Sequence, residues 1–238
     1  MKKSLYALPL CALLQSGIAH ALWEYNWLAG VYGGVAERRG NVELIESHPN
    51  GLVTSYYNPQ VDVGVIGGLL GGYQARCNDW LFGAELNIEW QEITHDRNFA
   101  FTNALDEGVS GTSIYKQRNI VGVSGRFGYE MFPNFLPYVR LGVQSSRDKL
   151  IIRAITSDFS DSVDMEGIRR VYRLMAGVGA EFPICFLMGL SVRAEYNFRA
   201  RGGSIEAFTL AEDDETFAFG SSRPKTNTLL LALVFNFV

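Results

Sequence analysis

The chain has 238 residues, of which 47% are hydrophobic, 13% are aromatic and 25 are glycines. This composition is too apolar for a disordered chain and too rich in glycine for a helical bundle, and the length favours one domain. The net charge of -4, without a large cluster of Lys and Arg, argues against nucleic acid as a partner.

Residues 1–21 have the features of a secretory signal peptide. Lys2 and Lys3 precede an apolar run, and Ala19-His20-Ala21 provides the small residues of a cleavage site. The apolar run is shorter than the roughly 20 residues that a transmembrane helix needs. We therefore expect a signal peptide at 1–21 and a mature domain at 22–238.

Eight segments of the mature chain alternate apolar and polar residues, which is the period of a β-strand. In chain order they cover 27–36, 60–73, 82–90, 121–129, 138–144, 173–182, 190–199 and 226–238. The clearest runs from Phe82 to Trp90. The second and last alternate poorly, because Ile66, Leu70 and Leu230 fall on the otherwise polar side.

The connections between these strands alternate strictly in length. Tight turns near 77–79, 131–135 and 183–186 alternate with long connections at 38–59, 92–115, 148–168 and 201–225. This alternation predicts an all-β, antiparallel, up-and-down barrel of eight strands, with all tight turns and both termini at one end. Bacterial outer-membrane barrels have this asymmetry.

The polar face of the strands indicates which side points outward. A soluble lipocalin-like barrel also alternates, but with its apolar face inside. Here glycines such as Gly68 and Gly122 are interleaved with Arg and Glu, as the narrow lumen of an eight-stranded barrel requires. Aromatic residues at both ends of the apolar face, such as Trp80 and Tyr115, are typical of interfacial girdles. The pattern favours a transmembrane β-barrel with its apolar face toward lipid.

Four motifs occur in order along the mature chain: Gly71-Gly72-Tyr73-Gln74, Asn78-Asp79-Trp80-Leu81-Phe82-Gly83-Ala84-Glu85, Pro137-Tyr138-Val139-Arg140-Leu141-Gly142 and Arg193-Ala194-Glu195-Tyr196. They resemble the small eight-stranded barrels of the outer membrane protein A and opacity protein superfamily, over nearly the whole mature chain. The resemblance implies a surface antigen, an adhesin or an envelope-stabilising barrel in the bacterial outer membrane. It also implies insertion by the barrel-assembly machinery, whose favoured terminal aromatic is displaced by one position in Phe237-Val238.

Charged residues on the polar face are expected to project into the lumen: Glu85, Glu89, Arg126, Arg140, Arg173, Glu181, Arg193 and Glu195. Because an unpaired buried charge costs several kcal/mol, these residues should pair with one another or with trapped water. We interpret them as a structural network. A narrow gated pore is the alternative, although an eight-stranded lumen is too narrow for an open channel.

An enzyme that modifies lipid A is the competing class of function. Acyl transfer needs a nucleophile and a base at bonding distance. His95-Asp96 lies near a strand end and His48 lies in the first long connection, but a lone His-Asp pair is more typical of a polar turn. We therefore expect no catalytic residue and no cofactor.

The two cysteines of the mature chain, Cys77 and Cys185, fall in different tight turns, nearly opposite around the barrel. That separation argues against a disulfide within the chain, so bridges between chains and free thiols both remain open. Two ligands are too few for a zinc site, and we expect no metal.

Function is expected in the long connections, which the barrel would hold at the cell exterior with both termini in the periplasm. Phe99 and Phe101 lie in the second connection, and Phe217 and Phe219 lie in the fourth. Such aromatics can anchor a host or envelope partner, or they can prolong the strands above the membrane. The sequence thus predicts a non-enzymatic barrel, surrounded by outer-membrane lipid, with external loops for surface interaction.

Overall fold

The computed structural model describes residues 23–47, 53–93, 96–103, 106, 108–132, 134–156, 162–184, 187–210 and 217–237. The strands are β1 (Trp23–Ser47), β2 (Val53–Cys77), β3 (Trp80–Glu92), β4 (Asp96–Thr102), β5 (Gly108–Tyr129), β6 (Leu136–Thr156), β7 (Ser162–Pro183), β8 (Leu190–Arg199), β9 (Ile205–Leu210), β10 (Phe217–Ser222) and β11 (Lys225–Phe237). None of the described residues forms a helix that could cross a membrane.

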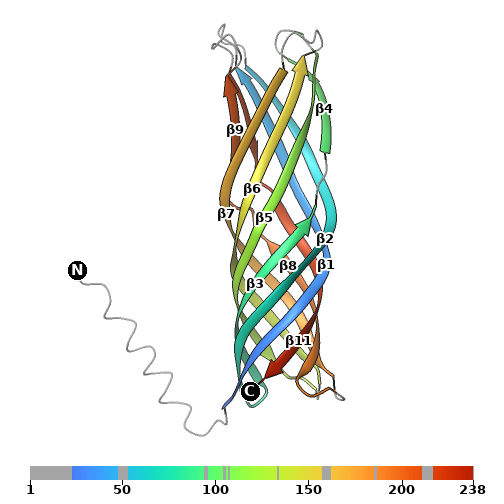
Figure 1. The fold of residues 1–238 in the computed structure, drawn as a ribbon, viewed down its shortest axis with the longest axis vertical. Coiled ribbons are helices and arrows are strands. Elements are labelled where there is room, and N and C mark those ends of the chain that lie inside the picture. The colour runs from blue at the N-terminus through green and yellow to red at the C-terminus, as the bar shows by residue number, and fades with distance from the viewer. Residues whose placement is uncertain are drawn as a thin grey trace, which may run out of the picture.

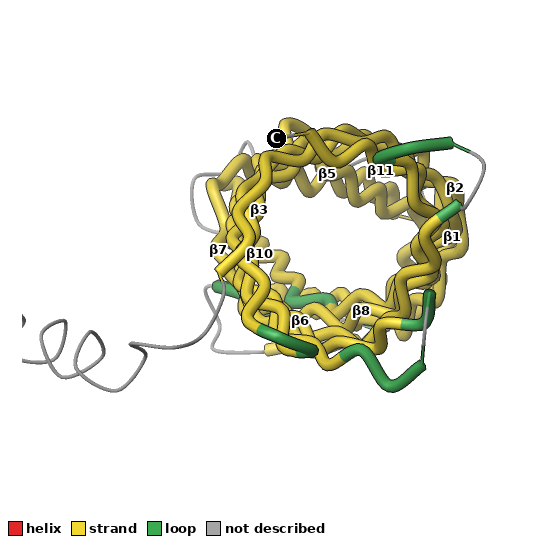
Figure 2. The backbone as a smooth tube through the Cα atoms, turned by 90° about the horizontal axis from the view of Figure 1, so that it is seen from below, coloured by secondary structure: helices red, strands yellow, loops and turns green. Residues whose placement is uncertain are grey.

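Eight of the strands pair in the order β1, β2, β3, β5, β6, β7, β8 and β11 and form an antiparallel barrel. Figure 2 shows that the barrel is closed. The ring closes where β11 pairs with β1, from Trp27 opposite Phe237 to Arg39 opposite Lys225. No edge is left open along these pairs, so the backbone groups of this part of the barrel are satisfied without water. The eight-stranded antiparallel barrel predicted from the alternation is confirmed.

The tight connections lie at one end of the barrel, together with the C-terminus (Figure 1). Asn78 and Asp79 join β2 to β3, with Cys77 opposite Trp80 in the register. Asn78 adopts a φ of 53°, a left-handed conformation that two-residue hairpin turns require and that Asn tolerates. We refer to the end of the barrel with the tight connections as the turn end and to the opposite end as the hairpin end.

The prediction of long loops at 38–59, 92–115, 148–168 and 201–225 is wrong, because most of these residues belong to strands. β1 and β2 pair from Trp23 opposite Cys77 to Ser47 opposite Val53. A strand needs only about 9–11 residues to cross a bilayer, so roughly half of each 25-residue strand extends beyond that length.

The three short strands complete the wall toward the hairpin end. β10 pairs with β1 and β9 pairs with β10, and β4 pairs with β5. β9 also packs against β7, where Gly167 lies against the backbone of Glu206. The hairpin half is thus built from β1, β2, β5, β6 and β7 with β4, β9 and β10 in place of β3, β8 and β11.

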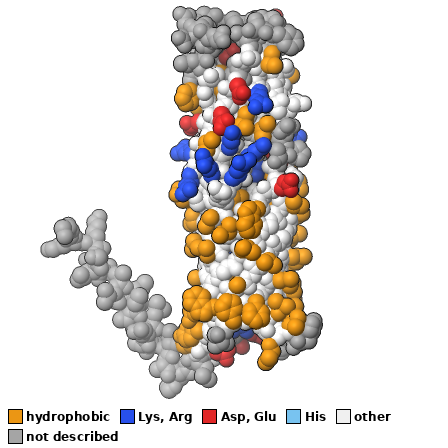
Figure 3. All heavy atoms as spheres, viewed as in Figure 1, with side chains coloured by type: hydrophobic (Ala, Val, Ile, Leu, Met, Phe, Trp, Pro, Cys, Tyr) orange, Lys and Arg blue, Asp and Glu red, His pale blue; other side chains and the backbone are white. Residues whose placement is uncertain are grey.

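The outer surface changes character halfway along the barrel. Toward the turn end it is an apolar band (Figure 3). The exposed side chains of this band include Val31, Val35, Leu69, Leu86, Ile88, Val123, Val143, Leu174, Val178, Leu229 and Leu231, with Trp27, Trp80, Phe82 and Phe127 near the turn end. A band of this kind with aromatic residues at its border is typical of a lipid-facing barrel wall.

The inner surface changes in the opposite sense at the same height. On β6 the outward residue Val143 of the apolar band is followed by the outward residue Arg147, while the inward residue Arg140 is followed by the inward residues Leu150 and Ile152. On β6 the hairpin half therefore has an apolar interior and a polar exterior, which is the pattern of a soluble barrel. The outward face of β2 does not follow this change, since Val53, Tyr57 and Val61 are exposed there.

An apolar cluster also lies inside the barrel between β1, β2 and β11. Its buried members are Leu28, Tyr32, Ala36, Ile66, Leu70, Ile93, Leu230, Ala232 and Val234. These residues explain the poor alternation of the second and last predicted strands, because both faces of those strands are apolar there.

Candidate functional site

Four buried charges from four strands meet in the lumen, and we call them the lumen square: Glu85, Arg126, Glu181 and Arg193. Arg126 donates from Nη1 to Glu85 Oε1 at 2.7 Å and from Nη2 to Glu181 Oε2 at 2.8 Å. Arg193 donates to the same two oxygens, from Nη1 at 2.6 Å and from Nε at 2.9 Å. Each side chain is at most 1% exposed, so the four charges neutralise one another out of contact with solvent.

A second group of contacts surrounds Arg140 on β6. Its Nη1 donates to Glu195 Oε2 at 2.8 Å, and its Nε donates to the Ser124 hydroxyl at 2.8 Å. The hydroxyl of Tyr138 donates to the other oxygen of Glu195 at 2.5 Å. The ring of Tyr138 also lies 4.1 Å from the guanidinium carbon of Arg126, which joins this group to the lumen square.

Two more charge pairs lie farther toward the hairpin end. Arg199 on β8 forms a bidentate pair with Glu89 on β3, at 2.7 Å and 2.5 Å. Arg173 on β7 pairs with Asp148 on β6, and Asp148 also accepts hydrogen bonds from the hydroxyls of Tyr115 and Ser146.

The phenol of Tyr115 is held in its neutral form. Burial, reinforced by the neighbouring Asp148 carboxylate, raises the pKa of Tyr115 above its ordinary value. Arg38 from β1 lies over its ring, with the guanidinium carbon 4.8 Å from the ring centre. Together with Arg173, these residues fill the lumen at the border of the apolar band nearer the hairpin end.

The structure places all eight sequence-predicted lumen residues inside the barrel. Seven of them join the contacts of the lumen square, Arg140 or Arg199, whereas Arg173 pairs apart from these, with Asp148. Among the described residues, six arginines and six carboxylates are buried, so the interior carries no net charge: Arg38, Arg126, Arg140, Arg173, Arg193, Arg199, Asp62, Glu85, Glu89, Asp148, Glu181 and Glu195.

Sequence reasoning missed four buried charged residues of the lumen: Arg38, Asp62, Asp148 and Arg199. Arg199 has the same parity as Arg193 on one strand, and Asp148 has the same parity as Arg140 on another. Arg199 lies within the expected strand at 190–199, and continuing the alternation of 138–144 past its expected end would have found Asp148.

Glycines make room for the long side chains of the lumen. A Cβ atom at Gly68 would overlap the ring of Tyr32, and one at Gly179 would overlap the ring of Tyr138. The close approach of a ring to the backbone therefore requires glycine at both positions.

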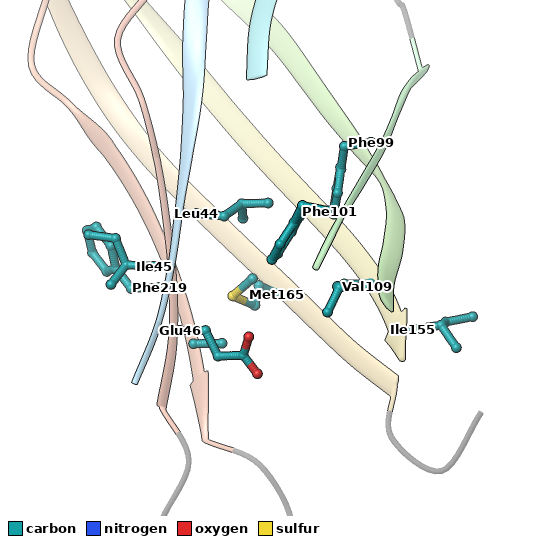
Figure 4. A pocket seen from close by; sticks show the side chains of 11 residues that line it. Leu44, Ile45, Glu46, Phe99, Phe101, Val109, Ile155, Met165 and Phe219 are labelled. Carbon is teal, nitrogen blue, oxygen red and sulfur yellow. The ribbon is translucent and has the colours of Figure 1, made fainter. Parts of the chain in front are cut away.

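An apolar core fills the hairpin half of the barrel. Its buried members are Val42, Leu44, Phe99, Val109, Tyr115, Leu150, Ile152, Met165, Val171, Ile205 and Ala207. Figure 4 shows Leu44, Phe101 and Met165 pointing toward one another from different strands. The cavity between them is about 50 Å³. Ligand pockets of about 300–1,000 Å³ are usual, so this cavity is too small for an organic ligand.

The four aromatic residues predicted as loop contacts belong to strands. Phe99 and Phe101 lie in β4, and Phe217 and Phe219 lie in β10. The alternative that they prolong the strands is the one the structure supports. Phe99 is buried in the apolar core and stacks with Phe101, so it does not form an exposed contact surface. Tyr115 also points inward and is not part of an outer aromatic girdle.

Phe219 differs from Phe99 because it faces outward. It lies opposite Ile45 of β1 and opposite Phe208 of β9. In Figure 4, Ile45 and Phe219 lie on the other side of β1 from Leu44. Phe208 is 68% exposed. We call Ile45, Phe208 and Phe219 the outer apolar row.

The sequence of residues 10–237 matches the family described as outer membrane protein beta-barrel domain. The chain belongs to this family. Bacterial outer membrane is therefore its location, and the apolar band of this outer membrane barrel faces lipid. No curated protein matches its sequence.

Solved structures of several outer membrane proteins have a similar fold. The outer membrane protease OmpT from Escherichia coli is 9% identical, with a TM-score of 0.46 over 89% of this chain and 97% of OmpT. The attachment invasion locus protein Ail of Yersinia pestis is 15% identical, with a TM-score of 0.34 over 88% of this chain and 99% of Ail. Neisserial surface protein A is 13% identical, with a TM-score of 0.33 over 87% and 99% of the two chains. These likenesses concern the fold alone.

Several sequence-predicted features fall outside the described residues: His48, His95, Cys185 and the acidic run at 212–215. The side chain of Asp96 is also outside them. Cys77 ends β2 as a half-buried free thiol. The described residues contain no cluster of three or more His, Cys, Asp or Glu suited to a metal ion.

Proposed function

We propose that this outer membrane barrel is a non-enzymatic surface protein whose hairpin end carries an interaction surface, as in adhesion or antigen presentation. The tight turns and both termini lie in the periplasm, and the hairpin end lies outside the cell. The least specific role that we propose for the barrel is a structural one in the envelope.

The observation that carries the proposal is the folded hairpin half. Five of its strands, β1, β2, β5, β6 and β7, continue from the membrane part, and its apolar core is packed around Leu150 and Ile152, which are fully buried. A wall of strands around a packed core holds its outer residues in fixed positions. This favours recognition, because residues that are already ordered lose little conformational entropy on binding.

The outer apolar row is the part of this wall best suited to a contact. Three apolar side chains lie directly opposite one another on β1, β10 and β9, and two of them are phenylalanines. Buried aromatic anchors contribute most of the affinity in protein interfaces. We therefore expect the row to face a host or envelope protein.

The test compares two variants on the bacterial surface. F208S with F219S should weaken attachment to host cells or matrix proteins more than about tenfold, because two anchors are removed. I155S, which alters an exposed apolar residue on β6, should leave attachment unchanged. If all surface phenotypes persist both in this double variant and after exchange of the hairpin tips, the adhesion role is lost and a structural role remains.

The enzyme alternative has its own test. Purified protein incubated with lipid A should leave the mass of the lipid unchanged, whereas gain or loss of one acyl chain would overturn the non-enzymatic proposal.

A further inference from the structure

Three exposed arginines form a row across the outer surface of β5, β6 and β7. Arg118 lies opposite Arg147, and Arg147 lies opposite Arg170. All three side chains are exposed. Residues directly opposite on neighbouring antiparallel strands have Cβ atoms about 5 Å apart, so the three positive charges are close neighbours. We call them the arginine row.

A β-bulge brings the first of these arginines to the surface. The register of β5 against β6 shifts between Arg118 and Val121, and Asn119 within the bulge has a φ of 50°. On the turn side of the bulge even-numbered residues such as Arg126 point inward, whereas on the hairpin side odd-numbered residues such as Tyr115 do. Without the extra residue Arg118 would point into the lumen.

The arginine row has no acidic partner among the described residues. Two other basic residues on β6 are neutralised, since Lys149 pairs with Glu166 at 2.6 Å and Arg153 pairs with Asp164 at 3.5 Å. Arg169, next to Arg170 on β7, donates to the backbone oxygen of Ser204 at 2.9 Å. Like charges directly opposite one another on a sheet are destabilising. An anion bound across the row would remove that repulsion.

The row lies at the border of the lipid-facing band. One row below it is Tyr172, 63% exposed, and the next row below is Val123, Val143 and Leu174. Two residues along a strand span about 7 Å, which places the guanidinium groups at the height of lipid headgroups. Figure 3 shows basic side chains gathered directly above the apolar side chains on this face.

The opposite side of the barrel has a different arrangement at the same height. There Val35 ends the apolar exterior of β1, and the next outward residues are Glu37 and Arg39, which pair with each other at 2.5 Å. An unpaired row of arginines is therefore a property of the β5, β6 and β7 face and not of the whole circumference.

We propose that the arginine row binds the phosphate groups of a phosphorylated lipid in the membrane leaflet on the hairpin side. Guanidinium groups bind phosphate oxygens through paired hydrogen bonds, and three of them in line can hold two phosphates of one headgroup. The acyl chains of that lipid then lie along the apolar band below. The assignment to the outer leaflet rests on the orientation given under the proposed function.

The test uses the full chain in detergent micelles, where leaflet and orientation play no part, so its result is independent of the adhesion proposal. Native mass spectrometry measures how much diphosphoryl lipid A the protein retains. The R118Q, R147Q and R170Q triple variant should bind it about a hundredfold more weakly, since each basic residue near a lipid surface contributes about 1 kcal/mol. R39Q should bind it as the unaltered protein does.

Two probes separate the phosphate from other sources of affinity. Lipid A stripped of its phosphates should bind as weakly to the unaltered protein as diphosphoryl lipid A binds to the triple variant. Inorganic pyrophosphate should fail to displace diphosphoryl lipid A at equal concentration. Undiminished binding of lipid A by a folded triple variant would refute the proposal, as would equal binding of the stripped lipid; displacement by pyrophosphate would replace the lipid with a soluble anion.

Discussion

Each charge in the lumen square depends on two others. Glu85 and Glu181 each accept hydrogen bonds from both Arg126 and Arg193, and all four side chains are removed from solvent. Replacing a whole buried ion pair by apolar residues is often neutral, but removal of one partner leaves an uncompensated charge in a medium of low dielectric constant. The stability of the lumen square should therefore fall far more when one charged residue is replaced than when an acidic and a basic residue are replaced together.

The first prediction concerns Arg193 alone. R193A should lower the free energy of unfolding by about 3–5 kcal/mol, because Glu85 and Glu181, which are at most 1% exposed, each lose a partner. Denaturant unfolding in lipid-free micelles measures this change. R147A, at an exposed position without an ion-pair partner, should not lower stability, because it removes the repulsion from Arg118 and Arg170. Equal effects of the two variants would mean that the square contributes nothing to stability.

The strands in the apolar band were predictable from the sequence, because lipid requires apolar residues on the outward face of each strand. An apolar outer face and a charged inner face repeat with a period of two through 82–90 and 190–199, and the barrel follows from the lengths of the connections. The pairing of the lumen charges was not predictable. Whether Arg126 on β5 meets Glu181 on β7 depends on the tilt and stagger of the strands, which local alternation does not contain.

The strands of the hairpin half were missed although their alternation is present. In β1, Asn41 and Glu43 point outward while Val42 and Leu44 are buried. Here the polar residues face outward and the apolar residues face inward, the reverse of the membrane part, because water replaces lipid outside the wall. A rule that assigns apolar residues to the outside finds no strand there, and so Phe99 was expected on the surface.

The second prediction follows from that reversal and uses two adjacent residues on β6. Ile152 is fully buried in the apolar core, whereas Ile151 points outward. I152D should unfold the hairpin half by burying a charge without a partner. Limited trypsin digestion of protein in liposomes should then cleave at Lys149 or Arg153, while I151D should remain resistant.

The membrane part serves as the internal control for this experiment. In both variants the protected segments of β3, β8 and β11 should survive digestion, because the lumen square lies in a different part of the barrel from Ile152. Loss of these segments in I152D would mean that the two halves fold as one unit.

At the scale of the whole molecule, the barrel wall is surrounded by lipid in its turn half and by water in its hairpin half. In the membrane part the charges are inside and the apolar residues meet lipid. In the hairpin half an apolar core lies inside, and charged residues such as Arg147 and Glu166 are exposed. The change occurs at one height around Arg38, Asp148 and Arg173, where the buried charges end and the apolar core begins. The barrel thus joins a membrane protein to a soluble barrel through continuous strands.

This arrangement closes the lumen several times over. A cavity of about 490 Å³ opens at the turn end and is lined by Glu181, a member of the lumen square. Beyond the square lie the pair of Glu89 and Arg199, the contacts of Asp148, and the apolar core. An ion crossing the barrel would have to break each of these in turn, and the side chains around the cavity of the last are apolar except for Glu46.

The third prediction is that the protein conducts no steady current across a planar bilayer, and that R193A conducts none either. Removal of Arg193 opens only one of the layers, while the paired Glu89 and Arg199 and the side chains of Leu150 and Ile152 still fill the lumen. Recording should be followed by recovery of the protein from the same bilayer, so that absence of current is not absence of insertion. Discrete conductance steps in R193A, with none in the unaltered protein, would instead identify the square as a gate and the lumen as a conduit.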